Sequence, residues 1–129
     1  MVPGLSTHVA ESVVYADETG LDVGTYVQIY NAAGFLMPLE VDWVHRIKWS
    51  AKHPVMTIKP MAAGRLLPLV GLGFAWGTLR DRDMVTVGAL SPDEAREVIE
   101  ISLGCLERRT DNVELQRTRS KDTVSAKKP

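Results

Sequence analysis

The chain has little cysteine, because Cys105 is the only one among its 129 residues. A single thiol cannot form a disulfide within the chain, so nothing in the sequence indicates an oxidising compartment. No histidine or lysine flanks Cys105 to activate it, which favours a half-buried structural cysteine on a helix over a reactive one. Cysteine and histidine also do not recur at the spacing of metal ligands, and we therefore expect no metal.

Long apolar runs and an excess of charge are absent as well. No stretch approaches the roughly 20 apolar residues that cross a bilayer, and residues 1–4 do not resemble the basic start of a secretory signal. The net charge of -1 and the isoelectric point near 6.3 give no reason to expect a nucleic acid as partner. We expect a cytoplasmic protein that contacts neither nucleic acid nor membrane.

What the chain does contain is a fourfold alternation of short apolar runs with helix-like segments. This alternation is typical of a parallel sheet with crossover helices. The expected strands are residues 4–8, 25–30, 55–58 and 84–87. The expected helices are residues 10–19, residues 41–52, a short segment carrying Phe74 and Trp76, and residues 92–109. The last helix has the clearest start, with Ser91 as N-cap, Pro92 at N1 and Glu94 closing a capping box.

Four strand–helix units amount to half of a (βα)8 barrel, and this α/β half-barrel is the fold that we predict for residues 1–109. A half-barrel leaves two sheet edges and one sheet face uncovered. We therefore expect it to be completed by oligomerisation, either as a homodimer or with a complementary half-barrel. Residues 110–129 have few apolar side chains and a basic excess, which predicts a charged, mobile tail.

Side chains alternate between the two faces of a strand, and this parity separates a polar from an apolar set. The polar set, which we expect to face the barrel interior, comprises Ser6, His8, Gln28, Tyr30, Thr57, Lys59, Thr86 and Gly88. The apolar set, which we expect to lie under the helices, comprises Leu5, Val27, Ile29, Met56, Ile58, Val85 and Val87. Enzymes of this fold place their sites at the C-terminal mouth of the barrel. Alternatively, the polar set faces water on an open sheet.

Lys59 and His8 are the candidate catalytic residues. A lysine at a strand end could hold a phosphate or carboxylate, or form a Schiff base if it is desolvated, although an ion pair is the more common role. His8 could exchange a proton near neutral pH, but a single histidine is more often a hydrogen-bonded structural residue. We interpret His45 and His53, on or after an expected helix, as surface residues.

Two loops suit an anion. Gly64 and Arg65 follow the third strand with backbone freedom and a positive charge. The turn from Gly88 to Ser91 precedes a helix N-terminus, whose N–H groups favour phosphate. Barrels often bind phosphate after their last two strands. Ser91 is, however, explained by capping alone.

Four motifs, in order across residues 4–98, resemble the second half of the aldo-keto reductase family. They are Gly4-Leu5-Ser6-Thr7-His8, Gln28-Ile29-Tyr30-Asn31, Pro60-Met61-Ala62-Ala63-Gly64 and Gly88-Ala89-Leu90-Ser91. The resemblance implies a nicotinamide cofactor, NAD(P), with Ser6 and Gln28 at the nicotinamide carboxamide. The remaining implied cofactor-binding residues are Asn31, Gly64, Arg65, Gly88, Ser91 and Glu94.

Several positions depart from that family. Ile58 stands where an aromatic residue commonly stacks on the nicotinamide, Glu94 where a basic residue pairs with the 2′-phosphate, and Val98 where an asparagine lies near adenine. The catalytic Asp, Tyr, Lys and His of the family belong to the first half of its barrel, which has no counterpart here. If the chain is an enzyme, the resemblance implies an NAD(P)-dependent oxidoreductase that needs a partner to supply that half.

Three hypotheses follow from these observations. The first is a half-barrel that binds a nucleotide or another phosphate-bearing ligand at the C-terminal mouth of its strands. The second is a non-catalytic homo-oligomer, a structural remnant of a barrel protein. The third is a lyase or isomerase that uses Lys59 and His8.

Overall fold

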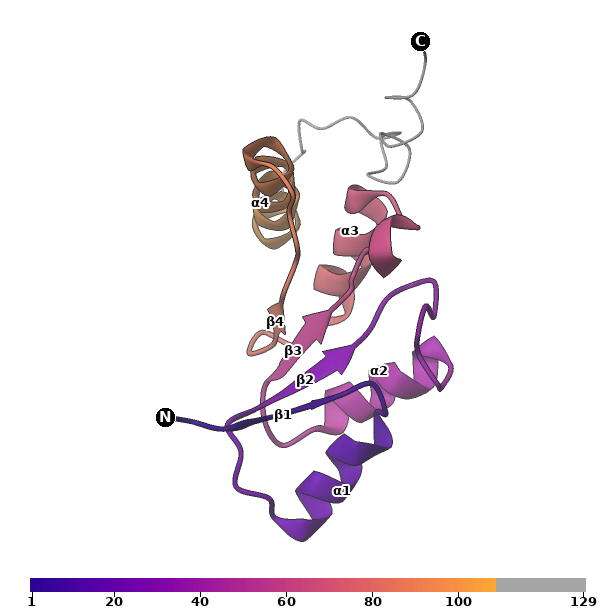
Figure 1. Ribbon diagram of the computed structural model, residues 1–129, viewed down its shortest axis with the longest axis vertical. Helices are drawn as coiled ribbons and strands as arrows, with labels where there is room; N and C mark the ends of the chain where they lie inside the picture. The colour runs from indigo at the N-terminus through magenta and orange to yellow at the C-terminus, as the bar shows by residue number, and fades with distance from the viewer. Residues whose placement is uncertain (109–129) are drawn as a thin grey trace.

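The computed structural model describes residues 1–108 and confirms the alternation of strands and helices (Figure 1). The strands are β1 (Gly4–Thr7), β2 (Thr25–Ile29), β3 (Val55–Ile58) and β4 (Met84–Val85). The helices are α1 (Glu11–Thr19), α2 (Val41–Ser50), α3 (Pro68–Thr78) and α4 (Pro92–Glu107), with the short 3-10 helix η1 at Ala62–Gly64. None of the helices within residues 1–108 is long and apolar enough to span a membrane. The tail predicted for residues 110–129 lies outside the described residues.

The strands form one parallel sheet in the order β1-β2-β3-β4. A helix follows each strand, as expected for a half-barrel of four strand–helix units. β1 and β4 are the two edges of this sheet. β4 is shorter than the expected strand at residues 84–87. One hydrogen bond to β3 follows its end, from the Thr86 amide to the Thr57 carbonyl at 2.8 Å. Because β4 has a neighbour on one side only, fewer hydrogen bonds hold it extended.

The helix ends follow their local sequence signals. α1 ends at Gly20, which takes the left-handed conformation at φ 69° that glycine adopts without strain. At the start of α4, the Ser91 hydroxyl accepts from the Glu94 amide at 3.2 Å, which confirms the predicted N-cap. The Glu94 carboxylate accepts from the Leu90 amide at 2.7 Å, one residue earlier than in the usual capping box.

The main core lies between the sheet and the pair α1 and α2, which lie side by side on one face of the sheet (Figure 1). Its buried members are Ala10, Val13, Ala16, Val23, Tyr26, Tyr30, Val44, Ile47, Ala51 and Val55. A second packing layer joins α3 to α4, where Leu72, Ala75 and Ile101 are fully buried. α3 also approaches the end of β3 closely at Gly71, because a Cβ there would lie 2.7 Å from the Pro60 carbonyl oxygen.

The register corrects the expected division of polar and apolar faces. Thr7 is aligned with Gln28 and Gln28 with Thr57, whereas Ser6 is aligned with Val27. Gln28 and Thr57 therefore lie on the face that α1 and α2 cover, and both are fully buried. The prediction of a polar interior face and an apolar helix-covered face was therefore wrong for β2 and β3, whereas Leu5 and Val85 lie on the helix-covered face and Ser6 on the opposite face, as predicted. Parity orders the side chains within one strand, but the offset between strands and the face that the helices cover are set by tertiary packing.

Candidate functional site

A cavity of about 490 Å³ lies at the carboxyl ends of β3 and β4, between the loops that lead into α3 and α4. This volume is in the range of small-molecule sites. The residues that line it are Lys59, Pro60, Met61, Ala63, Gly64, Leu66, Pro68, Thr86, Val87, Gly88, Ala89 and Leu90. Three of the residues singled out from the sequence, Lys59, Gly64 and Gly88, thus lie around one cavity. The carboxyl ends of neighbouring parallel strands are where ligands commonly bind in α/β folds.

The loop after β3 forms one wall of this cavity with an unusual backbone. Lys59, Ala62, Ala63 and Gly64 have φ values of 54°, 51°, 55° and 84°. The left-handed conformation costs a non-glycine residue on the order of 1 kcal/mol. The strain is held by hydrogen bonds from the Ala62 amide to the Lys59 carbonyl at 2.9 Å and from the Gly64 amide to the Met61 carbonyl at 3.0 Å. The turn at Lys59 leaves its side chain exposed at the cavity instead of under the helices.

The cavity combines one positive charge with a mostly apolar wall. Among the described residues that line it, Lys59 is the only one with a charged side chain and Thr86 the only one with a hydroxyl. An ammonium group with a neighbouring hydroxyl donor can bind a phosphate or carboxylate. The electrostatics of the cavity therefore favour an anionic ligand.

Arg65 and Asn31 were both predicted to bind the cofactor, but their side chains contact other parts of the chain. The Arg65 guanidinium lies 3.8 Å from the centroid of the Phe35 ring and donates to the Ala62 carbonyl at 3.3 Å. Asn31 is fully buried; its Nδ2 donates to the Phe35 carbonyl at 3.0 Å and its Oδ1 accepts from the Phe35 amide at 2.8 Å. Asn31 thus shapes the loop after β2, and neither side chain lines the cavity.

Ser6 and Gln28, the residues implied for a nicotinamide carboxamide, do not meet. Gln28 is fully buried under the helices, where its Nε2 donates to the Ile29 carbonyl at 3.2 Å. Ser6 is exposed and, by the register, lies on the opposite face of the sheet. The two side chains cannot hold one carboxamide in this arrangement, so these residues do not fit a nicotinamide group. His8 is exposed after β1, and β2 separates its strand from that of Lys59.

Ser91 and Glu94 are both engaged in capping α4. The first turn of this helix already carries the carboxylate of Glu94, and neither residue is among those that line the cavity. The expected phosphate position at this helix N-terminus therefore lies beside a negative charge. The cavity, with Lys59 opposite the loop at Gly88, is the better place for an anion.

Lys48 is a buried amine that the sequence analysis missed. Its side chain extends from α2 to the sheet, and the residue is 3% exposed. Nζ donates to the Thr57 hydroxyl at 2.6 Å and lies 3.8 Å from the centroid of the Tyr30 ring. Burial lowers the pKa of Lys48 to about 7, partly opposed by the negative charge of Asp83. A signal was present, because Lys48 follows Val44 by four residues and therefore lies on the apolar stripe of its helix.

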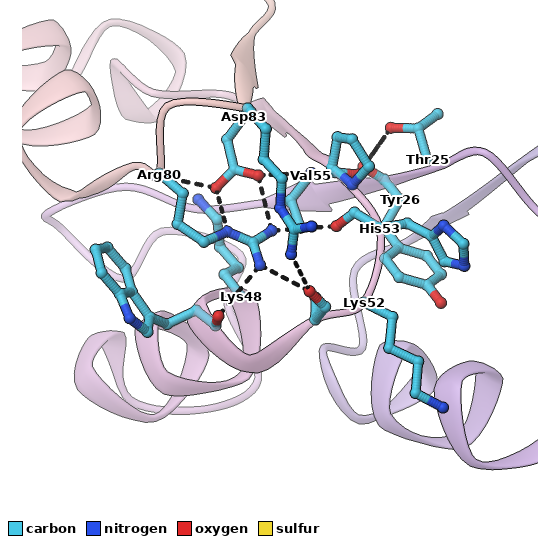
Figure 2. Close-up of polar contacts among 12 residues, drawn as sticks. Thr25, Tyr26, Lys48, Lys52, His53, Val55, Arg80 and Asp83 are labelled. Atoms are coloured by element: carbon cyan, nitrogen blue, oxygen red, sulfur yellow. Dashed lines mark hydrogen bonds and ion pairs between the residues drawn. The ribbon is translucent and has the colours of Figure 1, made fainter.

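Arg80 and Asp83 form a buried clamp at the opposite end of β3 from the cavity (Figure 2). The two side chains are joined at 2.8 Å. Arg80 also donates to three backbone carbonyls, that of Trp49 in the last turn of α2 and those of Ala51 and His53 between α2 and β3. Asp83 accepts from the Val55 amide at 2.9 Å, at the first residue of β3. Residues at the amino-terminal end of barrel strands commonly serve stability, and this clamp is structural.

The charge of Asp83 is maintained despite its burial. Burial works against the carboxylate, but hydrogen bonds from the Arg80 side chain, the Val55 amide and the Arg80 amide, with the Arg80 charge, hold the pKa of Asp83 below its usual value. Asp83 is therefore ionised around neutral pH. No sequence pattern distinguished these residues from an ordinary charged turn.

His45 and His53, which we interpreted as surface residues, are partly buried and make ring contacts. His45 Nδ1 lies 3.3 Å from the Tyr30 hydroxyl, and its ring lies 5.5 Å from that of Trp49. The His53 ring meets Tyr26 edge-on at 5.6 Å. Both histidines are half-buried, and each contacts a tyrosine: Tyr26 in β2 for His53, and Tyr30, the residue after β2, for His45.

Comparison with known proteins gave no match among protein families, curated proteins or solved structures. The resemblance to aldo-keto reductases therefore stays a prediction. Within residues 1–108, no group of three or more histidine, cysteine, aspartate or glutamate side chains is placed to hold a metal ion.

Proposed function

We propose that this chain binds a small phosphate-bearing ligand in the cavity between the β3–α3 and β4–α4 loops. The observation that carries the proposal is the position of Lys59, whose ammonium is the one charged group among the described residues that line this cavity. The ligand phosphate pairs with Lys59 and lies near the Thr86 hydroxyl. The backbone strain in residues 59–64 supports the proposal, because strained loops concentrate at binding sites.

The proposal assigns binding and no chemical step. A lyase or isomerase with Lys59 and His8 as partners draws no support from the geometry, because β2 lies between their strands and His8 is absent from the cavity wall. Adjacent strands are spaced about 4.8 Å apart, so strands two positions apart are separated by roughly 10 Å. Lys59 is therefore a binding residue in this account.

Replacing Lys59 with methionine should weaken the binding of inorganic phosphate about tenfold or more. A hydrogen bond to a charged group contributes roughly 1.5–3 kcal/mol, and methionine keeps most of the unbranched apolar stem without the charge. Isothermal calorimetry at constant low ionic strength measures the change. Because Lys59 is exposed, the folding transition should hardly move.

Arg96→Met is the matched control, since Arg96 lies on the nearby α4 and is exposed, but does not line the cavity. Equal weakening by Lys59→Met and Arg96→Met would mean that phosphate responds only to general positive charge. Phosphate binding unaffected by Lys59→Met would contradict the proposed site.

A second candidate function is a homodimer in which two sheets complete an eight-stranded barrel. The observation that favours it is the sheet face opposite α1 and α2, which carries the partly exposed apolar residues Val27, Met56, Ile58 and Met84. The edges β1 and β4 run parallel in one sheet, so β4 of one copy could pair with β1 of a second. This arrangement would cover the open face and both edges.

Light scattering tests the dimer directly. We expect a mass of twice the 14.2 kDa of one chain, and Met84→Lys, at the β4 edge, should shift the protein toward the monomer. Trp43→Lys, a change to an exposed residue of α2, is the control and should leave the mass unchanged. A native protein that scatters as a monomer at high concentration would contradict the candidate.

A further inference from the structure

The wall of the cavity specifies more of the ligand than its anionic group. Apart from Lys59, Thr86 and the two glycines, the residues that line it are apolar, namely Pro60, Met61, Ala63, Leu66, Pro68, Val87, Ala89 and Leu90. A nucleoside would bring hydroxyl and ring nitrogen atoms that need hydrogen-bonding partners, and leaving such groups unpaired is costly. The wall offers few side chains that could supply them.

Leu90 adds a second observation. It lines the cavity but is 92% exposed, at the mouth of the site just before α4. The structure holds its backbone in place, because the Leu90 amide donates to the Glu94 carboxylate. A large apolar side chain exposed at a cavity mouth gains burial when an apolar ligand covers it.

From these features we infer that the ligand is a small amphiphile with one anionic phosphate group and an apolar body, rather than a nucleotide. The inference rests on the proposed function, since it takes Lys59 as the partner of the phosphate. Charge complementarity places the anionic end at Lys59. The apolar body lies along the apolar part of the wall, which includes Val87, Leu66 and Leu90.

A series of monoalkyl phosphates tests the inference. Methyl, butyl, hexyl and octyl phosphate, each below its micelle concentration, are titrated by calorimetry into the full chain, alongside inorganic phosphate and adenosine monophosphate. Each methylene that enters the apolar wall should tighten binding about fourfold until the cavity is filled. Adenosine monophosphate should bind more weakly than octyl phosphate.

Two variants test separately how the apolar body and the phosphate group of the ligand contribute to binding. Leu90→Ser removes an exposed side chain and should not disturb the core; it should weaken octyl phosphate about tenfold and leave methyl phosphate unchanged. Lys59→Met should weaken every member of the series by a similar factor. Ile99→Ser, on the exposed side of α4 and outside the cavity, is the matched control and should change nothing.

The outcomes distinguish this inference from the proposed function. Equal affinity along the series, with binding that still depends on Lys59, would overturn the apolar body and leave the phosphate site standing. Tighter binding of adenosine monophosphate than of octyl phosphate would also overturn it. Binding to phosphatidic acid vesicles but not to free octyl phosphate would replace the small ligand by a membrane surface. If no phosphate compound bound at all, both proposals would fall.

Discussion

Replacing Arg80 with methionine is expected to lower the free energy of unfolding by about 3–5 kcal/mol, the largest loss for any single substitution considered. Arg80 is the partner of a buried carboxylate, and removing one member of a buried ion pair leaves the other charge uncompensated. The same substitution removes the donors to the carbonyls of Trp49, Ala51 and His53, which hold the end of α2 against the start of β3. Urea unfolding followed by circular dichroism measures the loss.

Arg46→Met is the control for the clamp. Arg46 pairs with Asp42 at the same distance of 2.8 Å, but the two side chains are 68% and 71% exposed. Exposed pairs of this kind contribute roughly 0–1 kcal/mol, so this variant should unfold close to the native midpoint. Similar losses in both variants would show that burial of the Arg80–Asp83 pair is not the source of its effect.

Lys48→Met, unlike Arg80→Met, should raise the free energy of unfolding, by about 2 kcal/mol at pH 7. The pKa of Lys48 falls from 10.5 to about 7 in the folded chain, and each tenfold change in proton affinity corresponds to about 1.4 kcal/mol. Methionine avoids this cost and fills a similar space. Part of the gain is offset because the Thr57 hydroxyl loses its partner, which costs roughly 1–3 kcal/mol.

The pH dependence gives the sharper test of Lys48. Between pH 7 and 10.5 the unfolded chain binds a proton at Lys48 that the folded chain has released, so native stability should rise with pH across this window. Below pH 7 both states are protonated, and the cost of burying the charge is fully present. The advantage of Lys48→Met should therefore fall by on the order of 3 kcal/mol as the pH rises from 7 toward 10, so that the native protein becomes the more stable of the two near pH 10.

Measurements should stop below about pH 10, where tyrosine begins to ionise in the unfolded chain. Burial, with the Asp17 hydrogen bond, raises the pKa of Tyr26 from 10.0 to about 12, so native stability falls again between about pH 10 and pH 12. Lys52→Met, a change to an exposed lysine, should follow the native profile. A stability difference between native protein and Lys48→Met that is constant with pH would contradict the assignment of a buried, easily deprotonated amine.

The elements that the sequence predicted well are those with local causes. β3 has the expected bounds, and α4 begins where Ser91, Pro92 and Glu94 indicate. The division of the sheet faces was not predictable in this way, because the register between strands depends on packing against α1 and α2. Lys48 shows the same limit: its spacing places it on the buried stripe, but its partner Thr57 belongs to another element.

In the candidate site too, the residues with local causes were predictable and those placed by tertiary contacts were not. Lys59, Gly64 and Gly88 directly follow or closely trail the ends of β3 and β4, so strand position alone brings them to the same cavity. Arg65 is next to Gly64 in sequence, yet its side chain lies against Phe35, a residue 30 positions earlier. Sequence spacing could not indicate this contact. Arg80 and Asp83 belong to a run of alternating charges that is indistinguishable in sequence from a solvated turn.

The most direct test of the central claim is to map where phosphate binds by following backbone amide signals in nuclear magnetic resonance spectra during a titration. The signals of Gly64 and Gly88 should move together and saturate at the same phosphate concentration, because both residues line the cavity beside Lys59. In Lys59→Met these shifts should need a roughly tenfold higher phosphate concentration. Unchanged signals at both glycines, at concentrations that shift amides elsewhere in the chain, would contradict the proposed site.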